Sequence, residues 1–217
     1  VYGWDETPGI VSVWADRDGR ALIWRRAGGR VLREQAAFRH WVLAAHLDDL
    51  AHLGPSLRPD DDRAPIGYRE LDGPPGSYRF LITARSLRSL ERALQHGAAR
   101  RLGRPVDSLA DLDDYYRVGP VEQYLMSSGR VYFRGLVYAD LRRMQIDLET
   151  TDLSPERGRI FMAAVRDSAG LATTLEAPRP EDEAALNVEL CALVRGRDPD
   201  IIENHNLFGF DMPFQIG

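Results

Sequence analysis

The chain has 217 residues, of which 44% are hydrophobic and 28% charged; this composition excludes a disordered or fibrous protein and allows one large or two small globular domains. Residues 1–140 carry 20 Arg against 19 Asp and Glu, a net of +1. Residues 141–217 carry 8 Arg against 14 Asp and Glu, a net of −6. The net charges of the two parts sum to −5. An acidic half repels nucleic acid, so a nucleic-acid function there would require metal ions.

Residue usage excludes several further classes. All 28 basic residues are arginine, and without lysine neither Schiff-base chemistry nor a Walker-type phosphate loop is available. No apolar run approaches the length that spans a bilayer, so we expect no membrane partner. The single cysteine, Cys191, cannot form an internal disulfide. No leader pattern follows Val1, so we expect a cytoplasmic protein.

The first part of the chain predicts a mixture of strands and helices. Two strands flank a turn at residues 16–19. A helical pattern over residues 38–54 ends at Gly54, an acidic loop follows to residue 67, and residues 77–83 predict another strand. His40, His46 and His52 are spaced six apart and would spread around such a helix, so we expect no zinc site there.

A basic helix is predicted over residues 84–104. Its apolar residues Leu87, Leu90 and Leu94 recur at helical spacing, while arginines occupy the opposite face. A basic helix face can follow the phosphates of a nucleic acid, although most such faces are simply solvated. The candidate nucleic-acid contacts on this face are Arg85, Arg88 and Arg92.

From Pro120 onward the pattern becomes more regular. A helix begins at Pro120 and ends at Gly129, and a short aromatic strand is predicted at residues 131–133. Beyond Arg142 the order is strand, strand, strand, helix, strand. The predicted elements cover residues 142–150, 159–170, 171–177, 180–196 and 200–204. We expect Cys191, inside the helical segment, to be a buried apolar filler.

Two carboxylates share one face of the first strand in this series. Asp147 and Glu149 lie two residues apart in "QIDLETT", so both side chains project to the same side of the sheet. Two carboxylates on one face repel each other unless a cation lies between them. Solvated acids on a surface strand are the commoner explanation of such a triplet, so the pair alone is weak evidence.

A third acidic residue strengthens the interpretation of this pair as part of a metal site. Asp211 follows the last predicted strand, in "DPDIIENHNLFGFDMPF". A strand–strand–strand–helix–strand order places the first and last of these strands side by side, which can bring Asp147, Glu149 and Asp211 around one point. Converging carboxylates without lysine suit two hard cations, Mg²⁺ or Mn²⁺, which could hydrolyse a phosphodiester.

Both acidic segments resemble motifs of family B DNA polymerases. "MQIDLETTDLSPERGRIFM" is similar to the first exonuclease motif, Asp-(Ile/Leu)-Glu-Thr, and "DPDIIENHNLFGFDMPF" to the second, Asn-x-x-x-Phe-Asp. The segment "GPVEQYLMSSGRVYFRGL" looks like the family's connection between its N-terminal domain and its exonuclease. The resemblance covers most of the chain and is firm from about Pro120 onward.

The resemblance implies a fold and an activity. It implies an α/β (α+β) chain with a mixed-sheet N-terminal domain at residues 1–130. A partial ribonuclease H-like 3′–5′ exonuclease domain, with its two-metal site, follows at 131–217. Asp147, Glu149 and Asp211 would be the catalytic metal ligands, with Glu149 also orienting the attacking water. Asn206 and Phe210 would position the single-stranded 3′ end of DNA.

The sequence also departs from the family pattern. The third exonuclease motif, Tyr-x-x-x-Asp, should lie well beyond Asp211, but the sequence ends at Gly217; nothing in it resembles the palm motifs, and Asn204-His205 replaces a more usual Gly-Tyr. We therefore expect the N-terminal part of a larger DNA-directed DNA polymerase, whose partners are the template strand and the rest of the polymerase chain. We expect this part alone to be inactive as a nuclease.

Two other functions remain open from the sequence. One is a nucleic-acid-binding module in which the arginine-faced helix holds single-stranded DNA and the acidic half is an inactive scaffold. The other is a stand-alone ribonuclease H-like exonuclease of DNA repair. Sequence beyond Gly217 separates the latter from a polymerase.

Overall fold

The structure, a computed structural model, describes residues 3–59, 61 and 63–216. The chain divides into two compact units, Val1–Arg134 and Gly135–Gly217. The predicted domains divide at residues 130 and 131, close to this boundary, and their assignment to named polymerase domains stays a prediction. No helix among the described residues is both long and apolar enough to cross a membrane.

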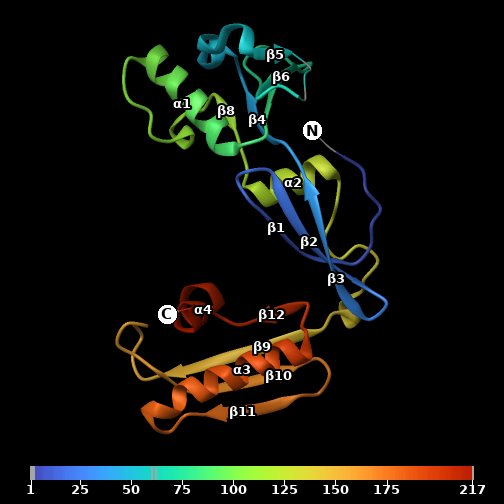
Figure 1. The fold of residues 1–217 in the computed structure, drawn as a ribbon, viewed down its shortest axis with the longest axis vertical. Coiled ribbons are helices and arrows are strands. Elements are labelled where there is room, and N and C mark those ends of the chain that lie inside the picture. Colours follow the sequence, from blue (N-terminus) through green and yellow to red (C-terminus); the bar gives the residue numbers. More distant parts are fainter. Residues whose placement is uncertain (1–2, 60, 62, 217) are drawn as a thin grey trace. The chain divides into compact units, whose positions relative to one another are not determined.

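Unit 1 contains two sheets (Figure 1). A three-stranded antiparallel sheet has the order β1-β2-β3, and a five-stranded sheet has the order β5-β6-β7-β4-β8. The strands of unit 1 are β1 (Ile10–Ala15), β2 (Arg20–Ala27), β3 (Arg30–Ala37), β4 (His40–Ala44), β5 (Leu57–Pro59), β6 (Ile66–Glu70), β7 (Phe80–Ala84) and β8 (Tyr115–Tyr116). Its helices are η1 (Asp48–Ser56), α1 (Leu87–Leu102), η2 (Leu109–Asp111) and α2 (Pro120–Ser128).

Helix α1 packs its predicted apolar face into the core of the five-stranded sheet. Leu87, Leu90 and Leu94 are buried, and Leu90 and Leu94 belong to one cluster with residues of β4 and β7. The side chain of Ser86 accepts a hydrogen bond from the backbone N–H of Ser89 and so caps the helix start. Gly103, with a φ of 65°, ends it in the left-handed conformation. The predicted helix is therefore confirmed.

The helix predicted over residues 38–54 is wrong. Residues 40–44 form strand β4, which pairs antiparallel with β7, and only η1, a 3-10 helix, follows. The apolar run around Trp41 is too short for its periodicity to distinguish a strand from a helix, and pairing with β7 decides it. The strand predicted at residues 131–133 is also absent, because Phe133 adopts a φ of 58°, outside the extended region.

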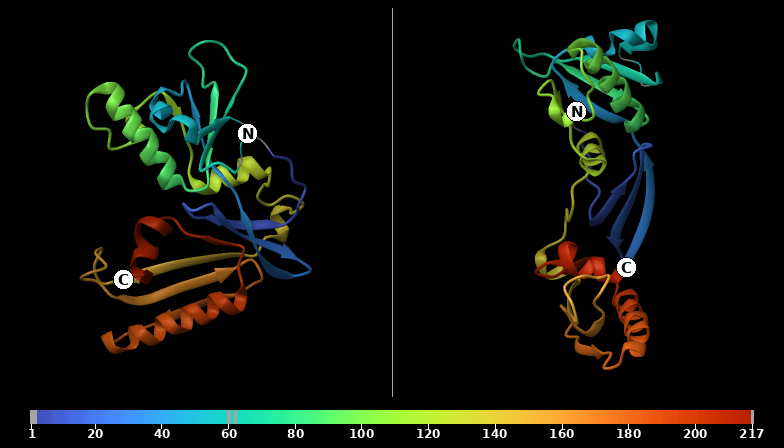
Figure 2. Two further views of the ribbon diagram at one scale, coloured as in Figure 1. Left: turned by 45° about the horizontal axis from the view of Figure 1, so that its top comes forward. Right: turned by 90° about the vertical axis from the view of Figure 1, so that its left-hand side faces the viewer.

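Unit 2 is one sheet covered on one face by a helix (Figures 1 and 2). Its elements are η3 (Tyr138–Asp140), β9 (Arg143–Thr150), β10 (Ile160–Asp167), β11 (Ala172–Glu176), η4 (Pro180–Asp182), α3 (Glu183–Arg197), β12 (Ile201–Glu203), η5 (Leu207–Asp211) and α4 (Met212–Ile216). The strand–strand–strand–helix–strand order predicted from the sequence is confirmed.

The sheet of unit 2 has the order β11-β10-β9-β12. Strands β9, β10 and β11 pair antiparallel, and the chain then crosses through α3 to place β12 parallel to β9. Leu186 and Leu190 of α3 are buried against Met144, Ile146 and Leu148 of β9. The predicted adjacency of the first and last strands, β9 and β12, is confirmed. The segment that follows β12 therefore begins beside β9.

Cys191 is exposed, so its predicted role as a buried filler is wrong. It follows directly on Leu190, which is buried. Successive residues on a helix point about 100° apart, so the neighbour of a core residue need not face the core. The apolar stripe of α3 is narrower than the apolar composition of its sequence indicates.

The packing of α1 on η1 generates a test of the fold. A Cβ added at Gly97 would lie only 1.6 Å from the backbone oxygen of Asp49. We expect Gly97→Ala to destabilise unit 1 by about 2 kcal/mol, because α1 must move outward. All 4 tryptophans lie in unit 1, so urea unfolding followed by tryptophan fluorescence measures this unit.

The matched control is Gly196→Ala on α3, where an added Cβ meets nothing within 4 Å. Alanine has a higher helix propensity than glycine, so unit 2 should be unchanged or stabilised by up to about 1 kcal/mol in circular dichroism melts. Equal destabilisation by both changes would contradict the close approach of α1 to η1.

Candidate functional site

Strand β9 separates acidic from apolar side chains onto its two faces. Met144, Ile146 and Leu148 are buried, whereas Asp147 and Glu149 are exposed. This alternation follows directly from the period of two in a strand. The structure therefore places the two predicted carboxylates together on the face of the sheet opposite α3.

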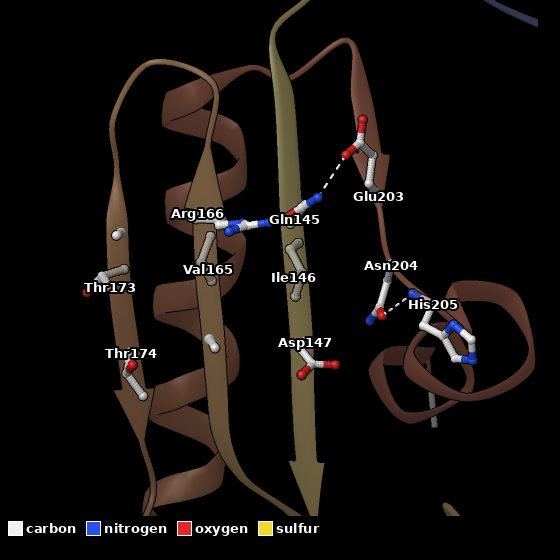
Figure 3. A pocket seen from close by; sticks show the side chains of 12 residues that line it. Gln145, Ile146, Asp147, Val165, Arg166, Thr173, Thr174, Glu203, Asn204 and His205 are labelled. Atoms are coloured by element: carbon white, nitrogen blue, oxygen red, sulfur yellow. Dashed lines mark hydrogen bonds between the residues drawn. The ribbon is translucent and has the colours of Figure 1, made fainter.

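Asp147 lines a pocket of about 970 Å³ on that open face (Figure 3). Side chains of β9, β10 and β11 form its floor, and Glu203, Asn204 and His205, at the end of β12, border it on one side. Figure 3 shows the carboxylate of Asp147 directed toward the segment that carries His205. The site thus lies where β9 extends beyond the shorter strand β12.

A chain of side-chain hydrogen bonds crosses the same face. Arg166 Nε donates to Gln145 Oε1, and Gln145 Nε2 donates to Glu203 Oε2 at 3.0 Å. Arg143 Nη1 also donates to Glu203 Oε1, at 3.4 Å. These bonds link three strands and hold the end of β12 in place beside the pocket.

The remaining predicted site residues follow β12. Asn206 is exposed and immediately precedes η5, and Phe210 is half-buried and packs against Phe214, with ring centroids 5.0 Å apart. Asp211 is only 4% exposed. It lines a pocket of about 220 Å³ with Leu148 and with residues of α3, on the covered side of the sheet.

The structure therefore brings two of the three predicted metal ligands together. The η5 segment lies beside the free edge of β9 (Figures 1 and 3), and Asp211 within it is buried near residues of α3. Among the described residues, no group of three potential ligands includes Asp147, Glu149 or Asp211. Asp147 and Glu149 are exposed carboxylates with the hard oxygens that Mg²⁺ and Mn²⁺ prefer, so this pair fits the predicted ions, and the part of Asp211 stays a prediction.

A different cluster of potential metal ligands lies in unit 1. His46, Asp49 and Asp114 each offer a ligand atom, and these atoms lie within 4.8 Å of one another; this is the one such group within the described residues. The sequence did not indicate it, because its members come from separate segments around η1 and β8. Chemically, two carboxylates and an imidazole can hold a divalent ion.

Arg101 of α1 already binds both carboxylates of this cluster. It donates from Nε to Asp49 Oδ1 at 2.8 Å, from Nη2 to Asp49 Oδ2 at 3.0 Å, and from Nη2 to Asp114 Oδ2 at 2.7 Å. The hydroxyl of Tyr115 also donates to Asp49 at 2.5 Å. A metal ion would have to displace the guanidinium, so we interpret the cluster as a structural ion network.

The network shifts the pKa of its members. Burial acts to raise the pKa of Asp49, but hydrogen bonds from Arg101 and Tyr115 outweigh it and hold that pKa below its ordinary value. The bond to Asp49 raises the pKa of Arg101. Burial, together with the bond to Asp49, raises the pKa of Tyr115. Asp49 is thus a carboxylate that the fold keeps ionised.

The predicted nucleic-acid contacts lie at and just before the start of α1. Arg88 and Arg92 are exposed on α1, opposite its buried leucines, and Arg85 is exposed two residues before the helix begins. The one acid in this region, Glu91, pairs with Arg17. The face is therefore basic, although its contact with DNA stays a prediction.

The chain has a structural relative among solved structures, found by its fold and not by its sequence. It matches the family B DNA polymerase of the hyperthermophilic archaeon Pyrobaculum calidifontis with a TM-score of 0.61 and 18% identity, over 98% of this chain. No protein family model matches the sequence, and no curated protein matches it. The resemblance to family B DNA polymerases is thus confirmed for the fold, as is the mixed α/β fold class.

The match covers only 31% of the archaeal polymerase chain. The chain therefore spans about a third of the length of the protein that it resembles. The activities of a complete polymerase belong to that larger protein.

The ion network in unit 1 predicts a pH dependence of stability. The pKa of Asp49 is lower in the folded than in the unfolded chain, so its stabilisation is complete above the ordinary pKa of 3.8 and is lost as pH falls through the folded value. We expect Asp49→Asn to cost about 1–3 kcal/mol at neutral pH, because Arg101 then keeps only one carboxylate partner, Asp114. The variant should lose less further stability than the parent on acidification below pH ~4.

Urea unfolding followed by tryptophan fluorescence at several pH values measures both effects. Asp113→Asn, at an exposed neighbouring position, is the matched control and should behave like the parent. Identical pH profiles for Asp49→Asn and the parent would contradict the role of this carboxylate.

Proposed function

We propose that this chain is the N-terminal part of a family B DNA polymerase and carries part of a two-metal 3′–5′ proofreading exonuclease. In the complete enzyme, the exonuclease acts on single-stranded 3′ ends of DNA, and unit 1 lies next to the template strand. A chain with a single, unpaired cysteine suits the reducing cytoplasm. The rest of the polymerase chain is its obligatory partner.

One arrangement carries the proposal. The first strand of unit 2 bears Asp147 and Glu149 on its open face, and the chain returns through α3 to place β12 parallel to that strand. Asn204 and His205, at the end of β12, border the pocket of Asp147 (Figure 3), and Asn206, Phe210 and Asp211 follow them in the sequence. This order of strands supports a site built from both motif segments.

The proposed roles follow from the chemistry of the side chains. Asp147 and Glu149 would hold Mg²⁺ or Mn²⁺ ions, which supply a hydroxide nucleophile and stabilise the departing oxygen of the phosphodiester. Glu149 would also orient the attacking water. Phe210 would pack against the terminal base and Asn206 would hydrogen-bond the frayed end.

Asp211 enters this proposal as the third ligand. It is buried in the short η5 segment that follows β12. Asp211→Ala tests this directly: activity equal to that of the parent enzyme would remove Asp211 from the ligand set.

The catalytic proposal is tested in a longer chain that includes the third exonuclease motif. We expect Asp147→Ala to lower the Mg²⁺-dependent rate of single-stranded DNA degradation by at least about a hundredfold, since an ion ligand and its charge are lost. Glu189→Ala, at an exposed position of α3, is the control and should leave the rate unchanged. A gel assay with a 5′-labelled oligonucleotide measures both.

We expect the 217-residue chain itself to show little or no nuclease activity. Mg²⁺-dependent degradation by this chain that Asp147→Ala left unchanged would show that the nuclease site lies elsewhere.

A second candidate function is that of a nucleic-acid-binding module. The observation that favours it is the exposed arginine face of α1, whose nearby acid, Glu91, is already paired. Arginines spaced three and four residues apart on one helix face can follow a phosphate backbone. This binding can coexist with the exonuclease in a complete polymerase.

Replacing Arg85, Arg88 and Arg92 together with glutamine tests this module. If each contacts a phosphate, the slope of log affinity against log salt should fall by about 2 for single-stranded DNA. The triple replacement of Arg58, Arg63 and Arg117, which are also exposed, is the control for net charge. Fluorescence anisotropy at several salt concentrations measures the slope, and equal slopes for both triple variants would reject a specific role for α1.

A further inference from the structure

Two exposed histidines of unit 1 lie in contact across two separate elements. His52 of η1 and His96 of α1 have ring centroids 4.9 Å apart, with an angle of 64° between the ring planes. Both residues are exposed, and neither ring forms a hydrogen bond or ion pair with any residue that the structure describes. The ring nitrogens of this pair are therefore open to a ligand from solvent.

The two elements that carry these rings are held tightly together. Arg101 of α1 donates to both carboxylate oxygens of Asp49 of η1, at 2.8 and 3.0 Å. The backbone oxygen of Asp49 also lies where a Cβ on Gly97, the neighbour of His96, would be placed. Because packing and ion pairing fix both backbones, the imidazoles of His52 and His96 meet without the closure of a loop, which lowers the entropic cost of binding a ligand between them.

The spacing of the rings fits two imidazoles bound to one metal ion. A zinc–nitrogen bond of about 2.0–2.1 Å places each ring centroid about 3.2 Å from the ion. Two such rings are about 4.5 Å apart at a right-angled bond angle and about 5.2 Å apart at the tetrahedral angle. The observed 4.9 Å lies between these values. Rotation about χ2, which is broad for histidine, turns the nitrogens toward one point and leaves the centroids nearly in place.

We propose that His52 and His96 form a two-histidine surface site for a divalent transition-metal ion, with water completing the coordination. The ion bridges η1 and α1, the two elements that Arg101 also joins. The site consists of unit 1 residues alone, and it stands or falls independently of the proposed exonuclease. It is also separate from the His46, Asp49 and Asp114 cluster, whose carboxylates Arg101 already binds.

The ligand atoms decide which ions this site takes. Imidazole nitrogen suits Zn²⁺, Ni²⁺ and Cu²⁺, whereas Mg²⁺ takes hard oxygen ligands. The Irving–Williams order predicts that Cu²⁺ binds more tightly than Ni²⁺ or Zn²⁺. Arg92 and Arg100 are exposed on α1, four residues to either side of His96. Their positive charge opposes a cation, so the site is weaker than the same pair of histidines on a neutral surface.

Isothermal titration calorimetry of the 217-residue chain with Zn²⁺, Ni²⁺ and Cu²⁺ tests the site. His52→Ala and His96→Ala should each weaken binding of all three ions at least about tenfold, because one of the two protein ligands is lost. Both positions are exposed, so the fold should tolerate the changes, and circular dichroism confirms it. A parent chain that binds none of the three ions, or binding that both variants retain, would overturn the proposal.

Two matched variants control for other sites that such ions favour. His46→Ala removes a third histidine of unit 1, which lies beside two carboxylates. Cys191→Ser removes the exposed thiol of unit 2. Each should bind the ions within about twofold of the parent. Loss of binding in either variant would place the ion at that residue and overturn the assignment to His52 and His96.

Nuclear magnetic resonance of the imidazole nitrogens locates the ion directly. In a protein labelled with ¹⁵N at its 5 histidines, Zn²⁺ should shift the ring signals of two, and the variants His52→Ala and His96→Ala assign these signals. Zn²⁺ that shifts no ring signal would reduce the pair to a contact between two rings. Shifts confined to the other histidines would place the ion elsewhere. Either result would overturn the site.

Discussion

The parallel pairing of β12 with β9 is the constraint on which the candidate site depends. Three residues of β12 pair with Arg143, Met144 and Gln145, and the Gln145–Glu203 hydrogen bond reinforces the contact. Because β12 stops there, the rest of β9 keeps a free edge, and the segment from Asn204 onward lies beside it. A longer β12 would pair with Asp147 and Glu149 and close the edge to that segment.

The two carboxylate clusters in this chain differ in how their negative charge is compensated. In unit 1, Asp49 and Asp114 both pair with the guanidinium of Arg101, so part of their negative charge is compensated within the fold. In unit 2, Asp147 and Glu149 are exposed on an open face in the more acidic part of the chain. The second arrangement leaves the oxygens available to an external cation, and it is therefore the better candidate for catalysis.

On the open face of the unit 2 sheet, the side chains differ from one β-strand to the next in a way that could bind the end of a DNA strand. Strand β9 carries the carboxylates of Asp147 and Glu149, and β10 carries Ala164 between Met162 and Arg166. A polyanion could be held by the arginine at one point and reach cations at another. Strand pairing alone places these side chains next to one another, because side chains of one row on adjacent strands lie within about 5 Å. No loop is needed to position them.

The sequence by itself determined the elements of unit 2, the helix with Leu87, Leu90 and Leu94, and the placement of Asp147 and Glu149 on one face. In each, a local period of 2 or 3.6 residues is enough to predict the outcome. Only the tertiary structure decided that residues 40–44 form a strand, that Cys191 is exposed, that Asp49 joins Arg101, and that Asp211 is buried. These outcomes depend on which segments pack together, and the local periodicity of the sequence does not predict that packing.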